Sequence, residues 1–139
     1  MSKLSFEEVN ALAGKVFAPW VRELGLEPVS YDGKGGNFRL PDDRALVHIG
    51  NVVCGQAIAA AADTAIVYVL TALNGRMRMF TTVDFTTHFL RPIPPGACDI
   101  RVEVLSNGKR MAYLRVDFRA AGSEKLAATV TSAFAYLED

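Results

Sequence analysis

The chain has 139 residues, which is the length of a single domain, and half of them are hydrophobic, enough to build one core. Charged residues make up 22% of the chain, a share that excludes an intrinsically disordered protein. Fifteen basic residues balance fifteen acidic ones, so the charge does not favour nucleic acid or a membrane surface as a partner. We expect one domain over residues 1–139, opened by a helical segment over residues 1–25.

The first predicted element is a helix that begins after Ser5. Ser5 and Glu8 form the S-x-x-E capping box, in which each side chain accepts a hydrogen bond from the backbone N–H of the other residue. Pro19 breaks this helix, because proline lacks the N–H that a helix interior needs. Residues 20–24 add a further turn, which Gly25 ends. The opening residues carry acidic side chains where a secretion signal needs an apolar run, so we expect no such signal here.

Six further segments have the composition of β-strands, and turn-forming residues separate most of them. Alternating polar and apolar residues, rich in Thr, Val and Phe, predict the last four. The six predicted strands cover residues 27–31, 36–40, 77–90, 98–106, 110–120 and 125–138. The turns "NGK" and "AGSE" join the last three strands as hairpins. We therefore expect two strands and a loop, then a long helix, then an antiparallel meander of four strands.

The longest predicted element is an apolar helix over residues 52–73, which Asn74 and Gly75 end. It is long enough to cross a bilayer, but it is rich in alanine and holds Asp63 at its centre. A central aspartate costs ~2.5–3.5 kcal/mol on insertion scales. We therefore expect this helix to lie in the core of the domain rather than in a membrane.

These elements predict an α+β fold in which a curved antiparallel sheet of about six strands wraps around one central helix. At ~1.5 Å per residue, some twenty residues of helix span ~30 Å. That is about the width of six strands spaced ~4.8 Å apart. The alanines of residues 57–65 are small enough to let the helix approach the sheet, or a second copy of itself, closely.

Asp63 is the residue that this arrangement does not explain. It is the only charged residue between Asn51 and Arg76, and its neighbours at residues 59–62 and 66–67 are apolar. It lies too far inside the helix to cap it. Because burying a carboxylate costs free energy and raises its pKa, we interpret Asp63 as a functional residue rather than as part of an exposed helix face.

Three stretches carry motifs with a recognisable spacing. "CGQAIAAAADTA", residues 54–65, has a glycine at the helix start and an aspartate eight residues later. "TTVDFTTHFLRPIPPG", residues 81–96, has a V-[DE]-[FLM] strand that runs into an LRP…PG turn. Residues 106–137 contain a basic pair after a glycine and a final ATxTxxF strand. Over roughly residues 20–137 the chain resembles the small acyl-CoA thioesterases of the PaaI-like group, and this resemblance implies the hot-dog fold with an extra N-terminal helix.

The resemblance implies roles for three residues. Asp63 would be the catalytic carboxylate, acting either as general base on water or as nucleophile on the thioester carbonyl. The N–H of Gly55, at the positive end of the helix, would polarise that carbonyl and hold its oxyanion, although plain close packing also explains a glycine there. The Thr82 hydroxyl would orient the water or the carboxylate across a subunit interface, or Thr82 is an ordinary strand residue.

The chain departs from the family pattern at two places. The family often has Asn where this chain has His48, and His-Gly-Gly where it has Cys54, Gly55 and Gln56. His48 could replace the Asn as a donor or be an inert loop histidine, and Asn51 could take the role instead. We place Cys54 and Gln56 beside the substrate and do not expect Cys54 to be a nucleophile.

Basic residues beside two turns are candidates for binding the nucleotide end of coenzyme A, whose phosphates need cations. Arg91 flanks Pro92, and Lys109 and Arg110 follow a tight turn. The resemblance implies nucleotide binding at these positions, whereas a solvated hairpin end is the alternative for such charges. His88, three residues before Arg91, is expected to be structural.

The resemblance thus implies an enzyme that hydrolyses a small, medium or aromatic acyl-CoA to the free acid and CoA. It implies no metal and no cofactor beyond the CoA of the substrate, and a homodimer joined through its sheets that pairs into a dimer of dimers. Cys54 and Cys98 lack disulfide or metal spacing, so we expect free thiols in a reducing cytoplasm.

Two other functions fit the same fold. A non-catalytic acyl-CoA binding protein would explain the two departures from the family pattern. A hot-dog enoyl-CoA hydratase or dehydratase would pair His48 with Asp63 for proton transfer, but the spacing of these residues and the LRP…PG turn fit the thioesterase better.

Overall fold

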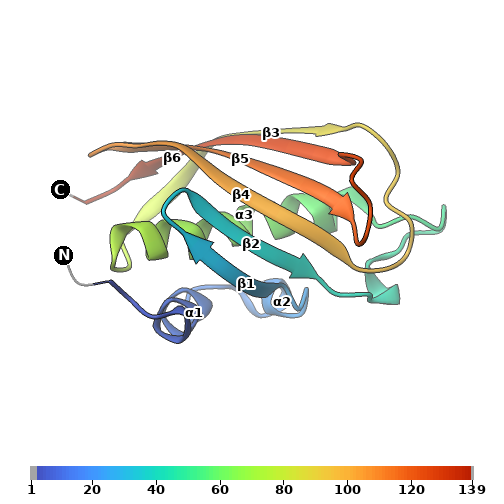
Figure 1. The fold of residues 1–139 in the computed structure, drawn as a ribbon, viewed down its shortest axis with the longest axis horizontal. Coiled ribbons are helices and arrows are strands. Elements are labelled where there is room, and N and C mark those ends of the chain that lie inside the picture. The colour runs from blue at the N-terminus through green and yellow to red at the C-terminus, as the bar shows by residue number, and fades with distance from the viewer. Residues whose placement is uncertain (1–2, 139) are drawn as a thin grey trace.

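One six-stranded antiparallel sheet curves around a long helix, and two short helices lie beside the edge of the sheet formed by the first strand (Figure 1). The structure is a computed structural model and describes residues 3–138. In chain order the elements are α1 (Phe6–Gly14), α2 (Pro19–Arg22), β1 (Glu27–Asp32), β2 (Gly35–Leu40), one turn of 3-10 helix (Arg44–Leu46), α3 (Gly55–Asn74), β3 (Phe80–Phe89), β4 (Cys98–Asn107), β5 (Met111–Ala120) and β6 (Ala128–Tyr136). This is the predicted α+β arrangement of the hot-dog fold.

The order of strands across the sheet is β1-β2-β4-β5-β6-β3, and every neighbouring pair is antiparallel. The predicted four-strand meander is therefore wrong in one respect, because β4, β5 and β6 form a meander but β3 pairs with β6 at the far edge. The irregular segment 90–97 carries the chain from β3 past β6 and β5 to β4. Hydrophobic alternation predicts that a strand exists but does not say which neighbour it pairs with.

Two helix ends follow the predicted chemistry, whereas α1 ends at Gly14, before Pro19, which begins α2 instead of breaking α1. Ser5 and Glu8 form both hydrogen bonds of the capping box, with N–O distances of 2.9 and 3.1 Å. Gly75 ends α3 with φ of 67°, the left-handed conformation that glycine adopts without cost. The predicted start of α3 is wrong by three residues: Val53 forms an isolated β-bridge with Val47, so the helix begins only after Cys54.

Two strands also begin three residues later than predicted. β3 starts at Phe80 rather than at residue 77, and β6 starts at Ala128 rather than at residue 125. Composition alone could not show where the regular ladder begins: before the strands, Met79 and Ala127 form only isolated backbone hydrogen bonds, to Leu137 and to Phe118, Leu90 and Arg91.

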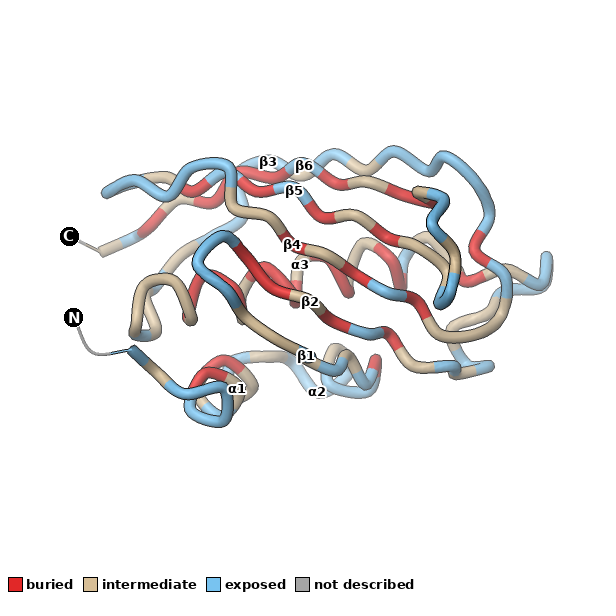
Figure 2. The backbone as a smooth tube through the Cα atoms, viewed as in Figure 1, coloured by how far each residue is buried: buried red, intermediate tan, exposed pale blue. Residues whose placement is uncertain are grey.

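The core lies between α3 and the concave face of the sheet. Four alanines, Ala57, Ala61, Ala62 and Ala65, are almost completely buried on α3, so the helix axis lies close to the sheet. Burial alternates along β5, where Ala112, Leu114, Val116 and Phe118 point inward. α3 is apolar and long enough to cross a membrane, but 56% of its most apolar stretch is buried inside this domain (Figure 2). It is therefore the predicted core helix.

The two edges of the sheet differ. Against β1, α1 packs through Phe6, whose ring lies 5.6 Å from that of Tyr31, and through Asn10, which accepts a 2.6 Å hydrogen bond from the Tyr31 hydroxyl. β3 forms the other edge and is exposed along most of its ten residues (Figure 2). Val83 and Phe89 on this strand are 59% and 57% exposed. A long exposed edge with apolar side chains is a template for pairing with another strand.

Candidate functional site

Asp63 lies on the half-buried side of α3, in its third turn. Its Oδ1 accepts a 3.0 Å hydrogen bond from the Thr82 hydroxyl on β3. Burial raises the pKa of Asp63 above the ordinary aspartate value, and the Thr82 hydrogen bond opposes part of that rise because it stabilises the charged form. A carboxylate with a raised pKa is a stronger base than an ordinary aspartate, which suits it to accept a proton from water.

A β-bulge aims Thr82 at Asp63. The register of β3 against β6 shifts between Thr82 and Asp84, which leaves Val83 as the extra residue. The Ser132 hydroxyl holds this irregularity by donating a 2.7 Å hydrogen bond to the Asp84 carbonyl. Bulges commonly redirect side chains next to functional sites. The predicted partnership of Thr82 with the carboxylate thus forms within one chain, and its role at a subunit interface stays a prediction.

A cavity of about 430 Å³ opens beside Asp63. Phe134 and Thr64 are buried at its base. Phe17, from the segment between α1 and α2, and Trp20 of α2 line another side. Neither aromatic residue is among those predicted from the sequence. The available signal was Trp20 itself, a large side chain in a helix too short to bury it.

Gly55 is the first residue of α3, and Cys54 is the N-cap. Within residues 3–138 the Cys54 side chain makes no capping hydrogen bond, and neither Gly55 nor Gln56 donates its N–H to an acceptor. These N–H groups therefore remain available at the positive end of a 20-residue helix. The ring of Phe89 lies against Gly55, 3.2 Å from where a Cβ would stand.

A second cavity, of about 480 Å³, lies beside Gly55 and is also lined by His48 and Arg91. His48 is exposed, and its Nδ1 accepts a 2.8 Å hydrogen bond from the Gly50 N–H, which leaves Nε2 to carry the proton. The Arg91 Nε donates to the Leu126 carbonyl at 3.1 Å. Three of the predicted site residues, His48, Gly55 and Arg91, thus line one cavity, whereas Cys54 and Gln56 are not among its lining residues.

The side chain of Asn51, the predicted substitute for His48, is engaged elsewhere. Its Oδ1 accepts a 3.4 Å hydrogen bond from Arg44, and its backbone has φ of 62°. His88 is exposed on the outer face of β3, opposite Thr129 of β6.

The structure does not bring Gly55 and Asp63 of one chain together. Eight residues of α-helix separate them by ~12 Å along the axis, and each lines its own cavity. A carboxylate that acts on a carbonyl must come within ~3–3.5 Å of the reacting atoms. One chain therefore supplies each group but not the pair.

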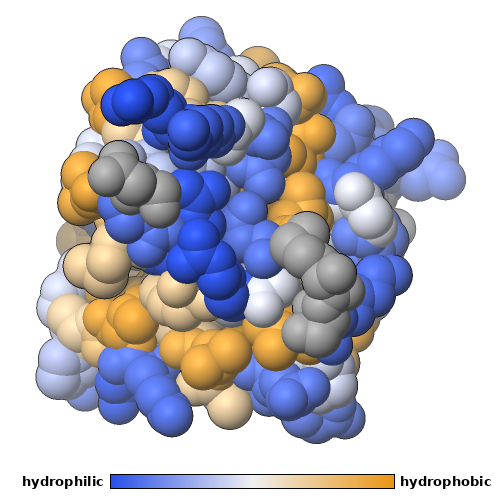
Figure 3. Space-filling model, turned by 90° about the vertical axis from the view of Figure 1, so that its left-hand side faces the viewer, coloured by the Kyte–Doolittle hydropathy of each residue, from blue (hydrophilic) through white to orange (hydrophobic). Residues whose placement is uncertain are grey.

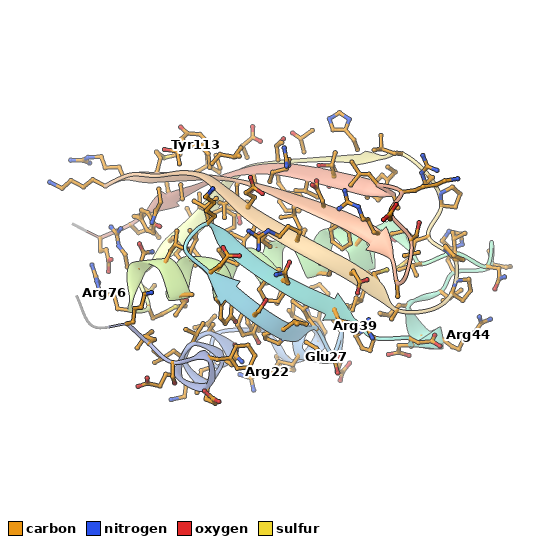
Figure 4. The ribbon with its side chains drawn as sticks, in the orientation of Figure 1. Arg22, Glu27, Arg39, Arg44, Arg76 and Tyr113 are labelled. Carbon is orange, nitrogen blue, oxygen red and sulfur yellow. The ribbon has the colours of Figure 1, made fainter. Side chains whose placement is uncertain are left out.

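Lys109 and Arg110 lie at the opposite end of the molecule from Gly55. They are exposed in the β4–β5 turn, beside the C-terminal end of α3. Arg76, labelled in Figure 4, comes just after that end of the helix. The Asn107 amide beside them donates a 3.0 Å hydrogen bond to the Asn74 side chain. Both ends of the described chain lie at this end (Figure 1), where hydrophilic residues occupy the middle of the surface and hydrophobic ones form a band below them (Figure 3).

The two cysteines are free thiols, as predicted. Burial raises the pKa of the Cys98 thiol to about 11, so Cys98 is a core residue without nucleophilic character. Across residues 3–138, acidic, histidine and cysteine side chains form no group of three that could hold a metal ion.

Comparison with known proteins identifies the family. Residues 50–127 match the thioesterase superfamily. A protein of Thermoplasma acidophilum, Ta0293, whose name places it provisionally among the esterases, is 33% identical over 105 residues, which cover 73% of this chain and 78% of that protein. The conserved protein PA5202 of Pseudomonas aeruginosa is 26% identical with a TM-score of 0.78, over 89% of this chain and 98% of that one.

Two further structures share the fold at lower identity. The thioesterase HI1161 of Haemophilus influenzae has a TM-score of 0.84 and 18% identity, over 99% of this chain and 93% of that one. The PaaI protein from the phenylacetic acid degradation operon of Escherichia coli has a TM-score of 0.78 and 20% identity, over 93% and 91% of the two chains. On the family match, the related sequence and the shared fold, this chain belongs to the thioesterase superfamily and is a thioester hydrolase with the hot-dog fold.

Proposed function

We propose that the thioester is an acyl-CoA, which the protein hydrolyses to a free acid and CoA. The observation that carries the proposal is the half-buried Asp63 carboxylate, hydrogen-bonded to Thr82 at the mouth of a largely apolar cavity. The free N–H groups at the start of the same helix supply the second element that acyl transfer needs, a donor for a developing oxyanion. The chain thus holds both parts of a hydrolytic site.

We propose that one active site combines Gly55 of one subunit with Asp63 of the other. The two ends of β3 are tied to these two groups, since Thr82 binds Asp63 and Phe89 lies against Gly55. When two copies pair antiparallel along their β3 edges, the start of one strand faces the end of the other. Such pairing brings Gly55 of the partner subunit toward Asp63 of this one.

The exposed edge of β3 supports this dimer. Its ten residues include no proline or lysine, the residues that commonly prevent edge pairing, and its apolar side chains Val83 and Phe89 are more than half exposed. Two edges joined in this way form one continuous twelve-stranded sheet. Light scattering should then give twice 15.1 kDa for the dimer, or four times that mass for the proposed dimer of dimers.

In the proposed reaction Asp63 acts as general base rather than as nucleophile. It removes a proton from water, and the hydroxide adds to the thioester carbonyl, whose oxygen accepts a hydrogen bond from the Gly55 N–H. Collapse of the tetrahedral intermediate breaks the C–S bond, and protonated Asp63 returns its proton to the CoA thiolate. In a single turnover in ¹⁸O-labelled water the base puts the label into the first acid released. Label in Asp63 would instead reveal a mixed anhydride that water opens at the Asp63 carbonyl, and would contradict the base.

Cations at two places support CoA as the leaving group. Arg91 lies just after the end of β3. Lys109 lies near the start of the same strand, because its carbonyl accepts a 3.2 Å hydrogen bond from Arg78, which precedes β3. The antiparallel dimer therefore brings Arg91 of one subunit toward Lys109 and Arg110 of the other, where they would bind the CoA phosphates. His48 would donate its Nε2 proton to the substrate beside Gly55.

The proposal needs water as the only co-substrate and no metal or further cofactor. Free cysteines support a cytoplasmic location, where CoA esters and reduced thiols occur together.

A panel of CoA esters tests the proposed function. Acetyl-, hexanoyl-, decanoyl- and phenylacetyl-CoA are incubated with the protein, and the released thiol is measured with a chromogenic disulfide. We expect turnover of at least one ester and no hydration of crotonyl-CoA. Saturable binding of the whole panel without thiol release would instead indicate a binding protein, and hydration of crotonyl-CoA would indicate a hydratase.

Replacing Thr82 tests its control of Asp63. In Thr82→Val the hydroxyl that lowers the pKa of Asp63 is gone, so that pKa rises further and the acid limb of the pH–kcat/KM profile moves to higher pH. Thr82→Ser keeps a hydroxyl and should return the limb toward its wild-type position. A uniform loss of rate without a shift of the limb would contradict this role and leave Thr82 as a packing residue.

A further inference from the structure

The cavity beside Asp63 has an aromatic wall that the hydrolytic chemistry does not use. Phe17 and Trp20 line it from the N-terminal segment, and Phe134 closes its base. Val67 and Met79 add aliphatic surface from α3 and from the residues before β3. The lining is apolar apart from a few polar groups that include Asp63, which suits an apolar ligand body attached to a reacting polar group.

The N-terminal wall is a fixed part of the fold. Arg22, which lies beside α1 in Figure 4, holds the turn between α1 and α2 through two hydrogen bonds. Its Nε donates to the Phe17 carbonyl at 3.1 Å, and its Nη2 donates to the Lys15 carbonyl at 3.0 Å. The Phe17 ring packs against Tyr68 of α3 with 5.4 Å between the ring centroids. The position of the Phe17 side chain is therefore fixed before a ligand binds, and this lowers the entropy cost of binding.

Trp20 is the part of the wall that the chain leaves uncovered. It is 62% exposed, and all four residues of α2 keep part of their surface in solvent. A tryptophan side chain buries up to ~250 Å² when covered, so a ligand body lying against it gains a large apolar contact. A body bonded to a carbonyl at Asp63 reaches this position, because Asp63 and Trp20 line the same cavity.

We propose that Trp20 and Phe17 determine acyl specificity and select acyl groups with a bulky apolar body, aryl or medium-chain, over acetyl. This inference rests on the proposed function. The cavity of about 430 Å³ accommodates such a body, whereas an acetyl group would leave both aromatic rings without contact. The N-terminal helices are then part of the substrate site rather than an appendage of the hot-dog core.

The first experiment measures a ratio, so that losses of folded protein cancel. The kcat/KM of decanoyl-CoA is divided by that of acetyl-CoA for the wild type, Trp20→Ala, Phe17→Ala and Ala60→Leu, which fills the cavity from α3. We expect each variant to lower the ratio about tenfold or more, the two alanine variants because they remove apolar contact and Ala60→Leu because its side chain occupies the space of the acyl group. The control is Leu105→Ala on β4, a similarly exposed side chain at 56%, for which the ratio should stay unchanged.

The outcomes separate the inference from the proposed function. If the wild type hydrolyses the panel but the ratio is unchanged in all three cavity variants, the specificity role is overturned while the hydrolase stands. If the wild type hydrolyses none of the CoA esters, the proposed function fails. The role of Trp20 and Phe17 in acyl selection is then tested by measuring ligand binding.

Trp20 also allows that binding measurement, because it is the only tryptophan of the chain. The non-hydrolysable thioether S-decyl-CoA is titrated against CoA without an acyl group. Coverage by the decyl chain should shift the emission of Trp20 to shorter wavelength and reduce its quenching by acrylamide, and CoA alone should do neither. An equal response to both compounds would refute the assignment. So would a Trp20 that is already protected from acrylamide in the free protein, because a second copy of the chain then covers it.

Discussion

Asp63→Asn should reduce kcat/KM for the best acyl-CoA ester roughly 10²–10⁴-fold, the contribution of a positioned general base. Asn keeps the shape of the side chain and can still accept the Thr82 hydrogen bond, but it cannot take a proton from water. The rate of thiol release under saturating and sub-saturating substrate measures the effect. A variant as fast as wild type would remove Asp63 from the mechanism.

The same substitution should stabilise the fold, with a defined pH dependence. Burial raises the pKa of Asp63 in the folded chain, so folding favours the neutral form, and the penalty for the charged form appears as the pH rises through the folded pKa. Partial exposure screens the charge and keeps this penalty near ~1 kcal/mol or less. We expect Asp63→Asn to melt about 2–4 °C above wild type at pH 7. The difference should vanish below the ordinary aspartate pKa of 3.8, where both states of the wild type are protonated.

Gly55→Pro should reduce kcat roughly 10²–10³-fold, the effect of removing one oxyanion donor. Proline is favoured at the first position of a helix, and the preceding Cys54 has φ of −69° and ψ of 148°, a conformation that residues before proline adopt. The substitution therefore removes the N–H without breaking α3. Gly55→Ala is the matched control, because it adds a Cβ against Phe89 but keeps the N–H, and we expect it to lose less than about tenfold. Equal losses in the two variants would show that crowding, not the N–H, matters.

Co-expression of the two inactive variants tests whether the site spans two subunits. A mixed dimer of Asp63→Asn and Gly55→Pro chains has one site with both groups intact and one with neither. Random pairing should then restore about a quarter of the wild-type activity in a symmetric dimer. If Gly55 and Asp63 of one chain act together, no mixture regains activity.

The sequence alone determined the elements and most of their ends. Local chemistry fixes these features: the capping box at Ser5 and Glu8, the glycine after α3, and the period-two patterns of the strands. The start of α3 was not predictable, because Val53 is as apolar as the helix residues and Cys54 is not a capping type. The pairing of Val53 with Val47 depends on where the loop between them folds back.

The sequence also determined that Asp63 is unusual, since a lone carboxylate in an apolar helix stands out without any structure. The tertiary structure alone decided what Asp63 contacts. The bulge at Val83 that turns Thr82 toward it depends on the register of β3 against β6, two strands far apart in the chain. The Trp20 wall depends on how the N-terminal segment packs on α3. Local sequence sets propensity and periodicity, whereas register, edge exposure and cavity walls result from contacts between distant segments, and for this reason only the folded chain defines the candidate site.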